Sequence, residues 1–265
     1  MQELTELYDA HNTYNMDEAG LYYSAAPGRS ICSATTLGVK KNKTRMTLAL
    51  TTNADGTDSL PVLFIGRAKK PRCFGKKTAA QLGYLYKKSV KAWMNTKIFQ
   101  EWLLQLDKEM WAAQRHILLL VDNVSSHSLG NLVLTNVKLQ SLPPNTTTYL
   151  QPLDAGIIAS FKAPFRSMQI DRAIDRFETG ENVQGSSVCK IDQLKAMQWS
   201  SLLWDSTGAC TVSHCCQKTG LALPIRGLHE DRHAENRAAA GSSKEEADTD
   251  DDMLDLTLKV ASISL

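Results

Sequence analysis

A short run of apolar residues, 117–121 (ILLLV), constrains the fold of this chain more than any other feature of its sequence. Five consecutive apolar side chains without polar alternation are typical of a β-strand that is buried on both faces. A strand of that kind lies in a sheet that helices cover on both sides. The run is also the longest apolar one in the chain, far shorter than the ~20 residues of a membrane-spanning helix. The sequence therefore predicts an α/β domain without a membrane segment.

The segments around this strand predict both hairpins and helices. Residues 45–52 and 60–65 are apolar and rich in β-type residues, and they flank an Asp-Gly turn, which predicts a hairpin. In residues 92–113 the tryptophans Trp93, Trp102 and Trp111 recur at helical spacing, which predicts a helix with these side chains in the core and Thr96 as its N-cap. Further strands are expected at 13–18 and 137–142, and further helices at 154–177 and 191–204. This order of elements predicts a mixed α/β domain.

Three aspartates stand where an α/β sheet builds a functional site. Asp17 lies near the end of the first strand, Asp122 follows the buried run directly, and Asp154 lies at the start of a predicted helix. Carboxylates that converge at the carboxyl edge of a sheet repel one another unless a cation neutralises them. Oxygen ligands of this kind suit Mg²⁺ or Mn²⁺. Each aspartate alone also fits a structural role, Asp17 in a turn and the other two at helix N-termini.

Seven short motifs give these aspartates a context. In chain order they are NMDEAG (15–20), NADG (53–56), LPVLFIG (60–66), KPRCF (70–74), DNVSSH (122–127), LPPNTT (142–147) and LQPLDAGII (150–158). Together they closely resemble the DDE-type transposase domain of the pogo/Tigger-like elements, in the Tc1/mariner superfamily. The resemblance covers about residues 3–223.

This resemblance implies an RNase H-like α/β fold, a mixed sheet flanked by helices, with a helical C-terminal extension. It implies that Asp17, Asp122 and Asp154 are the catalytic residues and bind two Mg²⁺ or Mn²⁺ ions. Proteins of this family cleave a DNA strand at the end of a mobile element and join the freed 3′-hydroxyl to target DNA. Asn123 and His127 match the family's second motif, where they are expected to orient Asp122 or the phosphate.

The sequence also departs from the family pattern. Family members usually carry helix-turn-helix units before the catalytic domain, and none is expected here because Asp17 stands so near Met1. Ala19 replaces the usual Thr or Ser, and Val124 replaces the usual Ala or Cys. Two interpretations remain: a metal-dependent DNA endonuclease and strand transferase without its usual DNA-binding module, or a catalytically inactive nucleic-acid-binding remnant of a transposase. Both imply DNA as partner and the nucleus as location, and a homodimer on DNA is a further expectation.

Charge is distributed unevenly along the chain. Residues 1–170 contain 20 Lys and Arg against 12 Asp and Glu, whereas residues 171–265 contain 10 against 16. A basic half is typical of proteins that bind nucleic acid, although a solvated lysine-rich surface gives the same count. Within the basic segment 67–91, contacts with the DNA backbone are expected from Lys69, Lys70, Arg72, Lys76 and Lys77.

Composition and motifs also predict where the parts of the chain begin and end. We expect residues 1–178 to form the RNase H-like catalytic domain and residues 179–223 to form a helical C-terminal part of the same domain. Residues 224–265 match no known motif, and their acidic stretch 241–255 is poor in apolar residues. That composition predicts a largely disordered tail.

Overall fold

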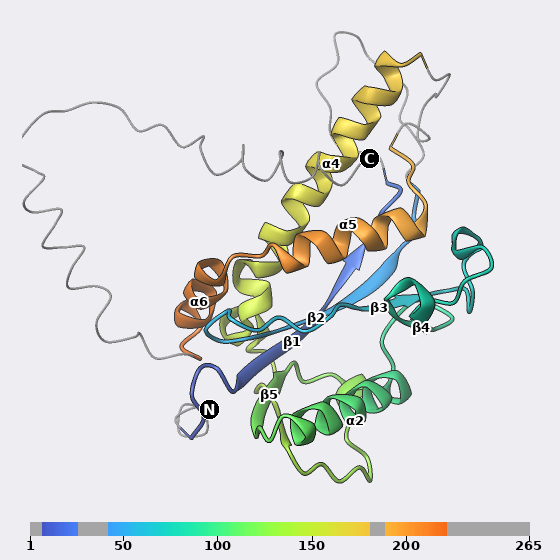
Figure 1. Cartoon of the computed structure of the whole chain (residues 1–265). Helices are drawn as coiled ribbons and strands as arrows, with labels where there is room; N and C mark the ends of the chain where they lie inside the picture. The colour runs from blue at the N-terminus through green and yellow to red at the C-terminus, as the bar shows by residue number, and fades with distance from the viewer. Residues whose placement is uncertain (1–6, 26–41, 181–188, 222–265) are drawn as a thin grey trace, which may run out of the picture. The chain divides into compact units, whose positions relative to one another are not determined.

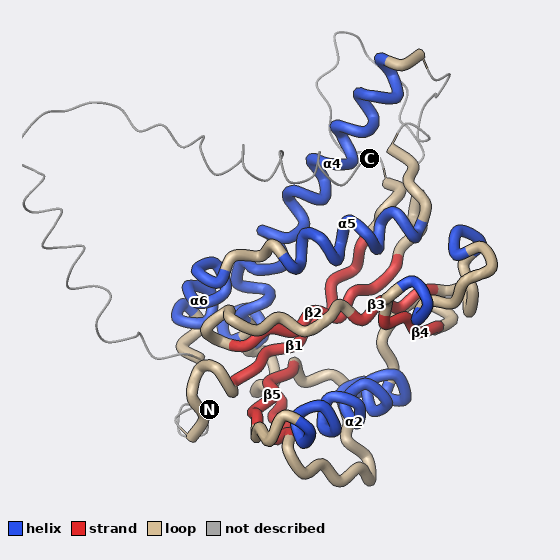
Figure 2. Tube along the Cα trace, in the orientation of Figure 1, coloured by secondary structure: helices blue, strands red, loops and turns tan. Residues whose placement is uncertain are grey.

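A mixed sheet with strand order β4–β3–β2–β1–β5–β6 lies at the centre of the structure (Figures 1 and 2). The computed structural model describes residues 7–25, 42–180 and 189–221. Its strands are β1 (Thr13–Leu21), β2 (Met46–Asn53), β3 (Leu63–Gly66), β4 (Leu85–Lys88), β5 (Ile117–Val121) and β6 (Val137–Ser141). The β1–β2 and β2–β3 pairs are antiparallel, and the β3–β4, β1–β5 and β5–β6 pairs are parallel.

The central strand β1 separates two hydrophobic cores. Successive side chains of a strand point to opposite faces. Tyr14 and Met16 therefore join the core under α2 (Thr96–Ala112), whereas Ala19 and Leu21 join the core under α4 (Ile158–Glu178) and α5 (Gln193–Asp205). All five residues of β5 are buried. The predicted strand that is covered on both faces is therefore confirmed.

Helix α2 covers one face of the sheet (Figure 1). Its buried side includes Phe99, Trp102 and Leu103. The predicted N-cap was wrong by one residue, because the Asn95 side chain, not that of Thr96, accepts a hydrogen bond of 3.0 Å from the backbone N–H of Ile98. This bond satisfies one of the N–H groups that a helix leaves unpaired at its start.

The tryptophan stripe of this segment is also corrected by the structure. Trp102 is buried as expected, but 54% of the surface of Trp93 and 70% of that of Trp111 are exposed. Trp111 follows Trp102 by nine residues, which places it roughly 180° around the helix, on the solvent side. Trp93 precedes the first residue of α2 and therefore does not share the helical periodicity.

The opposite face is covered by α4 (Ile158–Glu178) and α5 (Gln193–Asp205), and α6 (Ala209–Lys218) packs beside them (Figure 1). A short irregular turn of helix, η4 (Leu153–Ile157), leads into α4 and contacts both β1 and α6. A Cβ atom at Gly156 would lie 3.0 Å from the sulfur of Cys215. The glycine in the LQPLDAGII motif thus allows α6 to approach the helix that carries Asp154.

The predicted hairpin is confirmed as β2 and β3, whose antiparallel register pairs Thr47 with Ile65. Strand β4 was not predicted. It has only four residues, none of them buried, and Leu85 is 45% exposed. An edge strand of this length lacks the alternation of buried and exposed residues from which a strand is recognised.

The described residues belong to a compact unit, Met1–Leu223, and a second unit comprises Pro224–Leu265. The predicted disordered tail 224–265 lies outside the described residues. Among the described helices, none combines the length and the apolar character that are needed to cross a membrane.

Candidate metal centre

Two parallel strands and one helical turn bring the three predicted aspartates together. Asp17 lies on β1, Asp122 follows β5 directly, and Asp154 lies in η4. The parallel register pairs Asn15 with Leu120. Asp17 and Asp122 each follow their paired residue by two positions, so they lie opposite each other. The contact between η4 and β1 adds Asp154 to the same edge of the sheet.

A buried amide network fixes the segment that carries Asp154. The side-chain amide of Asn15 donates hydrogen bonds to the Leu120 carbonyl (3.1 Å) and to Oε1 of Gln151 (2.9 Å), and its oxygen accepts one from the Leu153 N–H (3.2 Å). Gln151 in turn donates to the carbonyl oxygen of Met16 at 3.2 Å. Asn15 and Gln151 are both buried. Because leaving such groups unpaired is costly, this network holds η4 against β1 and β5.

The Asp17 carboxyl group is buried next to other negative charges. Burial and the nearby negative charge of Asp154 raise the pKa of Asp17 to about 8, and the charges of Glu18 and Asp122 add to this. A hydrogen bond of 2.7 Å from the backbone N–H of Glu18 opposes the rise without cancelling it. Asp17 is buried, Asp122 is partly buried and Asp154 is exposed. Asp17 is therefore the most deeply buried of the three aspartates, and Asp154 is the one open to solvent.

His127 joins Asp122 to a residue that the sequence analysis did not single out, Glu18. Nδ1 of His127 lies 2.6 Å from Oδ1 of Asp122, and Nε2 lies 3.1 Å from Oε1 of Glu18. Burial lowers the pKa of His127, but the two carboxylates raise it more, to about 10. The imidazole also packs on Phe99 of α2, with 4.6 Å between the ring centres. One potential ligand atom from each of Glu18, Asp122 and His127 lies within 4.8 Å of the others.

The signal for Glu18 is present in the NMDEAG motif. Since side chains alternate along a strand, adjacent Asp17 and Glu18 point to opposite faces of β1. Asp17 faces Asp154, and Glu18 faces His127 beneath α2. Asp122, at the end of the neighbouring strand, interacts with both groups.

The residues present fit a divalent cation. Oδ1 of Asp122 is buried and receives no well-oriented hydrogen bond from the described residues, although it lies against His127. Burial first, and then the negative charge of Asp154, raise the pKa of Asp17 at the same place. Burial lowers the pKa of Lys162 on α4, a nearby base, whereas the charges of Asp154 and Asp17 oppose that effect. Hard carboxylate oxygens in such a field are the ligands that Mg²⁺ and Mn²⁺ prefer.

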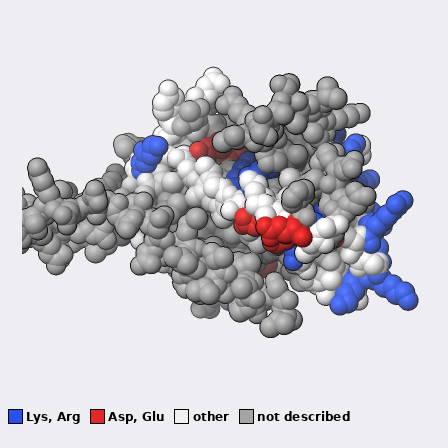
Figure 3. Space-filling model, turned by 90° about the horizontal axis from the view of Figure 1, so that it is seen from above, with Lys and Arg blue, Asp and Glu red and all other residues white. Residues whose placement is uncertain are grey.

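The remaining predicted residues lie elsewhere on the surface. The Asn123 side chain is exposed and makes no hydrogen bond within the described part of the chain. Lys69, Lys70, Arg72, Lys76 and Lys77 are exposed on the segment between β3 and β4. Figure 3 shows lysine and arginine side chains projecting at its right-hand margin, the side on which Figure 1 draws β4.

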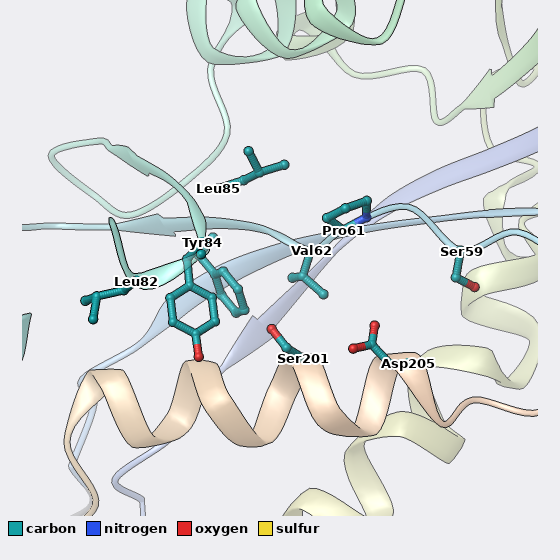
Figure 4. A pocket seen from close by; sticks show the side chains of 10 residues that line it. Ser59, Pro61, Val62, Leu82, Tyr84, Leu85, Ser201 and Asp205 are labelled. Carbon is teal, nitrogen blue, oxygen red and sulfur yellow. The ribbon is translucent and has the colours of Figure 1, made fainter. Parts of the chain in front are cut away.

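A pocket of about 310 Å³ lies apart from the predicted site residues, between β3, the segment leading into β4, and α5 (Figure 4). Tyr84 lies on one wall and Ser201 and Asp205 lie on the other. None of the predicted catalytic or DNA-contacting residues lines it. The candidate site is therefore the acidic sheet edge and not this cavity.

Comparison with known proteins gives a consistent result. The family model described as DDE superfamily endonuclease matches residues 43–215. The chain is 29% identical over 231 residues to CENP-B homolog protein 2 of Schizosaccharomyces pombe, and 29% identical over 235 residues to Tigger transposable element-derived protein 4 of Mus musculus. These alignments cover 83% and 88% of this chain but only 44% of each relative. The chain thus spans less than half the length of these relatives.

A solved structure supports the fold. The crystal structure of the Mos1 strand transfer complex matches with a TM-score of 0.50 and 14% sequence identity, and the match covers 89% of this chain and 56% of that chain. Together with the mixed sheet and its flanking helices, this likeness confirms the expected RNase H-like fold.

Proposed function

Because this chain belongs to the DDE superfamily endonuclease family, we propose that it is a divalent-metal-dependent DNA endonuclease and strand transferase of the DDE transposase class. The observation that carries the proposal is the convergence of Asp17, Asp122 and Asp154 at one edge of the sheet. Residues 1–178, with the helical part 179–223, form the catalytic domain in this proposal.

Each of these side chains has a distinct task. Asp17 and Asp122 would hold two Mg²⁺ or Mn²⁺ ions between them, and Asp154 would complete the binding of the second. Such a pair of ions would supply stabilisation of the attacking and the leaving oxygen in an in-line phosphoryl displacement. His127 orients Asp122 through the contact of 2.6 Å, and Glu18 orients His127. The Asn15 and Gln151 amides keep Asp154 against the strands.

The DNA substrate is positioned by charge. Lys69, Lys70, Arg72, Lys76 and Lys77 are exposed and contact the phosphate backbone without reading its sequence. A DNA substrate implies action in the nucleus. The strand transfer complex of the Mos1 match supports DNA as the partner, and a homodimer on DNA is part of the proposal.

The test is Mn²⁺-dependent nicking of supercoiled plasmid by the wild-type protein, by Asp122→Asn, and by the matched surface variant Asp171→Asn. Asp171 is exposed on α4. Nicking by the wild type and by Asp171→Asn, but not by Asp122→Asn, is the expected result. Equal nicking by Asp122→Asn indicates a contaminating nuclease, and absence of nicking by all three folded proteins contradicts the proposal.

A thermal-melting experiment tests the metal separately from the reaction. An ion that binds the native carboxylates and not the unfolded chain stabilises the protein by about 2.7 kcal/mol at 100 times its Kd. We expect Mn²⁺ to raise the Tm of the wild type and of Asp171→Asn, and to leave the Tm of Asp122→Asn nearly unchanged.

The second candidate function is a DNA-binding remnant without catalysis. The observation that favours it is the exposed lysine-rich segment between β3 and β4, which would bind DNA without help from the carboxylates. DNA binding that Asp122→Asn does not alter, with no cleavage in Mg²⁺ or Mn²⁺, supports this function over the first.

A further inference from the structure

Two exposed aromatic rings near the metal centre are held by cations. Trp93 and Tyr22 are 54% and 43% exposed. The guanidinium carbon of Arg45 lies 5.4 Å from the centre of the Trp93 ring and 5.8 Å from that of Tyr22, and the ammonium of Lys91 lies 5.9 Å from the Trp93 ring. We call these four residues the aromatic–cation cluster. Because more than half of the Trp93 side chain is exposed, hydrophobic burial does not explain why two cations lie against its ring.

The backbone holds Trp93 outward. Ala92, the residue before it, is fully buried and adopts a left-handed conformation with φ of 54°, which is unfavourable for a residue that has a Cβ atom. Its carbonyl accepts a hydrogen bond of 2.7 Å from Thr47, and its N–H donates one of 3.0 Å to Ser89. These bonds fix the turn that buries the small side chain and exposes the large one.

Arg45 has unused capacity for a ligand. Its Nη2 donates to Thr47 at 3.0 Å, but its Nε is buried and has no hydrogen-bond partner among the described residues. Within the same residues, no carboxylate forms an ion pair with it. The guanidinium is therefore an unneutralised positive charge beside two aromatic rings.

The cluster borders the acidic site. The Arg45 guanidinium lies 3.4 Å from the position of a Cβ atom on Gly20. Gly20 follows Glu18 by two residues on β1, so a side chain there would share the face of Glu18 and His127 and not that of Asp17. Two residues of strand span roughly 7 Å. Lys162 interacts electrostatically with Asp17, Asp154 and Arg45. A DNA strand whose phosphate reached the carboxylates would thus place a neighbouring nucleotide at this cluster.

We propose that the aromatic–cation cluster binds one unpaired nucleotide of the DNA strand beside the scissile phosphate. The base stacks on Trp93, with displacement of the flexible Lys91 side chain, and the phosphate pairs with Arg45. Every base offers a π-face, so the site tolerates any sequence. A fully paired duplex keeps its base faces stacked inside the helix, so the nucleotide must come from a single-stranded end or be turned out of the stack. This inference rests on the proposed action on DNA.

The test compares two fluorescein-labelled DNAs by fluorescence anisotropy, in EDTA and at low salt: a blunt duplex, and the same duplex with a short single-stranded 3′ overhang. The variants are Trp93→Ala, Trp93→Phe and, as matched control, Trp111→Ala, since Trp111 is also an exposed tryptophan but lies on α2. Loss of one base–aromatic stack weakens binding about 5- to 150-fold. We expect that loss of affinity for Trp93→Ala on the overhang DNA alone. Trp93→Phe should bind the overhang DNA more tightly than Trp93→Ala, and Trp111→Ala should bind both DNAs like the wild type.

Other outcomes overturn the inference. If Trp93→Ala binds the overhang DNA as tightly as the wild type, or loses affinity equally for both DNAs, the cluster does not hold an unpaired base. If the wild type binds neither DNA, the inference fails together with the proposed function. If the overhang effect is present but plasmid nicking is absent, the inference stands and the catalytic proposal fails, because this assay needs no metal.

Discussion

Glu18 lies beside the candidate metal centre, on the face of β1 opposite to Asp17. Its carboxylate holds Nε2 of His127, whose other nitrogen touches Asp122. Both partners are acceptors, so they favour the protonated imidazole, which explains why its pKa is raised despite burial. Glu18, on the face opposite to Asp154, is therefore linked through His127 to one of the three aspartates.

We predict that Glu18→Gln lowers the free energy of unfolding by about 1–3 kcal/mol, the range for loss of a charge-assisted hydrogen bond. A raised histidine pKa adds stability that is fully present below the unfolded value of about 6.5 and disappears as the pH rises through about 10. Urea unfolding at pH 6 and at pH 10 measures this. The difference from wild type should be larger at pH 6, whereas Glu178→Gln, on an exposed residue, should change neither.

The sequence predicted part of this site for clear reasons. Asp17, Asp122 and Asp154 follow recognisable strands and motifs, so their convergence was expected. Glu18 was missed because nothing in the sequence distinguishes a glutamate that contacts a buried partner from one that is exposed to solvent at the end of a strand. Only the fold shows that η3 (Ser125–His127) places a buried histidine opposite it.

At the scale of elements, Asp107 joins helix α2 to strand β6. Its carboxylate accepts hydrogen bonds from three consecutive backbone N–H groups, those of Thr135, Asn136 and Val137, at 2.8 to 3.1 Å for Oδ1. Burial raises the pKa of Asp107, but these three bonds outweigh it and leave the pKa below its usual range. The bonds fix where β6 starts, next to β5, the strand that Asp122 directly follows.

We predict that Asp107→Asn destabilises the protein by about 1–3 kcal/mol at neutral pH. A depressed carboxyl pKa adds stability above the unfolded value of 3.8 and loses it as the pH falls through the lower folded value. The stability difference between wild type and Asp107→Asn should therefore shrink on acidification below about pH 4. Chemical denaturation across that range measures it, and a difference that is independent of pH would contradict the role given to the charge.

The elements themselves were predicted to different extents. The buried strand β5 follows from an unbroken run of apolar residues, because burial on both faces leaves no polar alternation. Helix α2 follows from its helical period, because burial on one stripe repeats about every 3.6 residues. Strand β4 and the exposed Trp93 have no such period. Strand β4 is a half-exposed edge strand. The outward position of Trp93 depends on the left-handed backbone of Ala92, which no pattern of apolar residues reveals.

At the scale of the whole molecule, the acidic edge and the lysine-rich segment are separate charged surfaces. DNA binding through phosphates releases counterions, so the logarithm of the binding constant falls with that of the salt concentration by about 0.9 for each phosphate neutralised. The five basic residues expected to contact DNA, Lys69, Lys70, Arg72, Lys76 and Lys77, are exposed and available for such contacts.

We predict that a quadruple variant, Lys69→Ala with Lys70→Ala, Lys76→Ala and Lys77→Ala, weakens binding of duplex DNA and reduces the slope of the salt dependence by up to about 4. Anisotropy titrations at several salt concentrations measure this. Lys108→Ala, on an exposed residue of α2, is the control and should change neither quantity appreciably. An unchanged slope in the quadruple variant would show that DNA lies elsewhere.

The alternation of side chains along β1 has a mechanical consequence. The acidic edge is assembled from both layers, because Glu18 reaches His127 under α2 while the Asn15 amide holds η4 on the other side. The carboxylates that would hold a cation, and the side chains that contact and position them, therefore come from both layers. Local opening of either layer would dismantle the centre before the domain unfolds, so activity should follow the stability of the weaker layer. A cation bound at this edge would link the α2 layer to the α4 layer through its ligands, and removal of the cation would break that link.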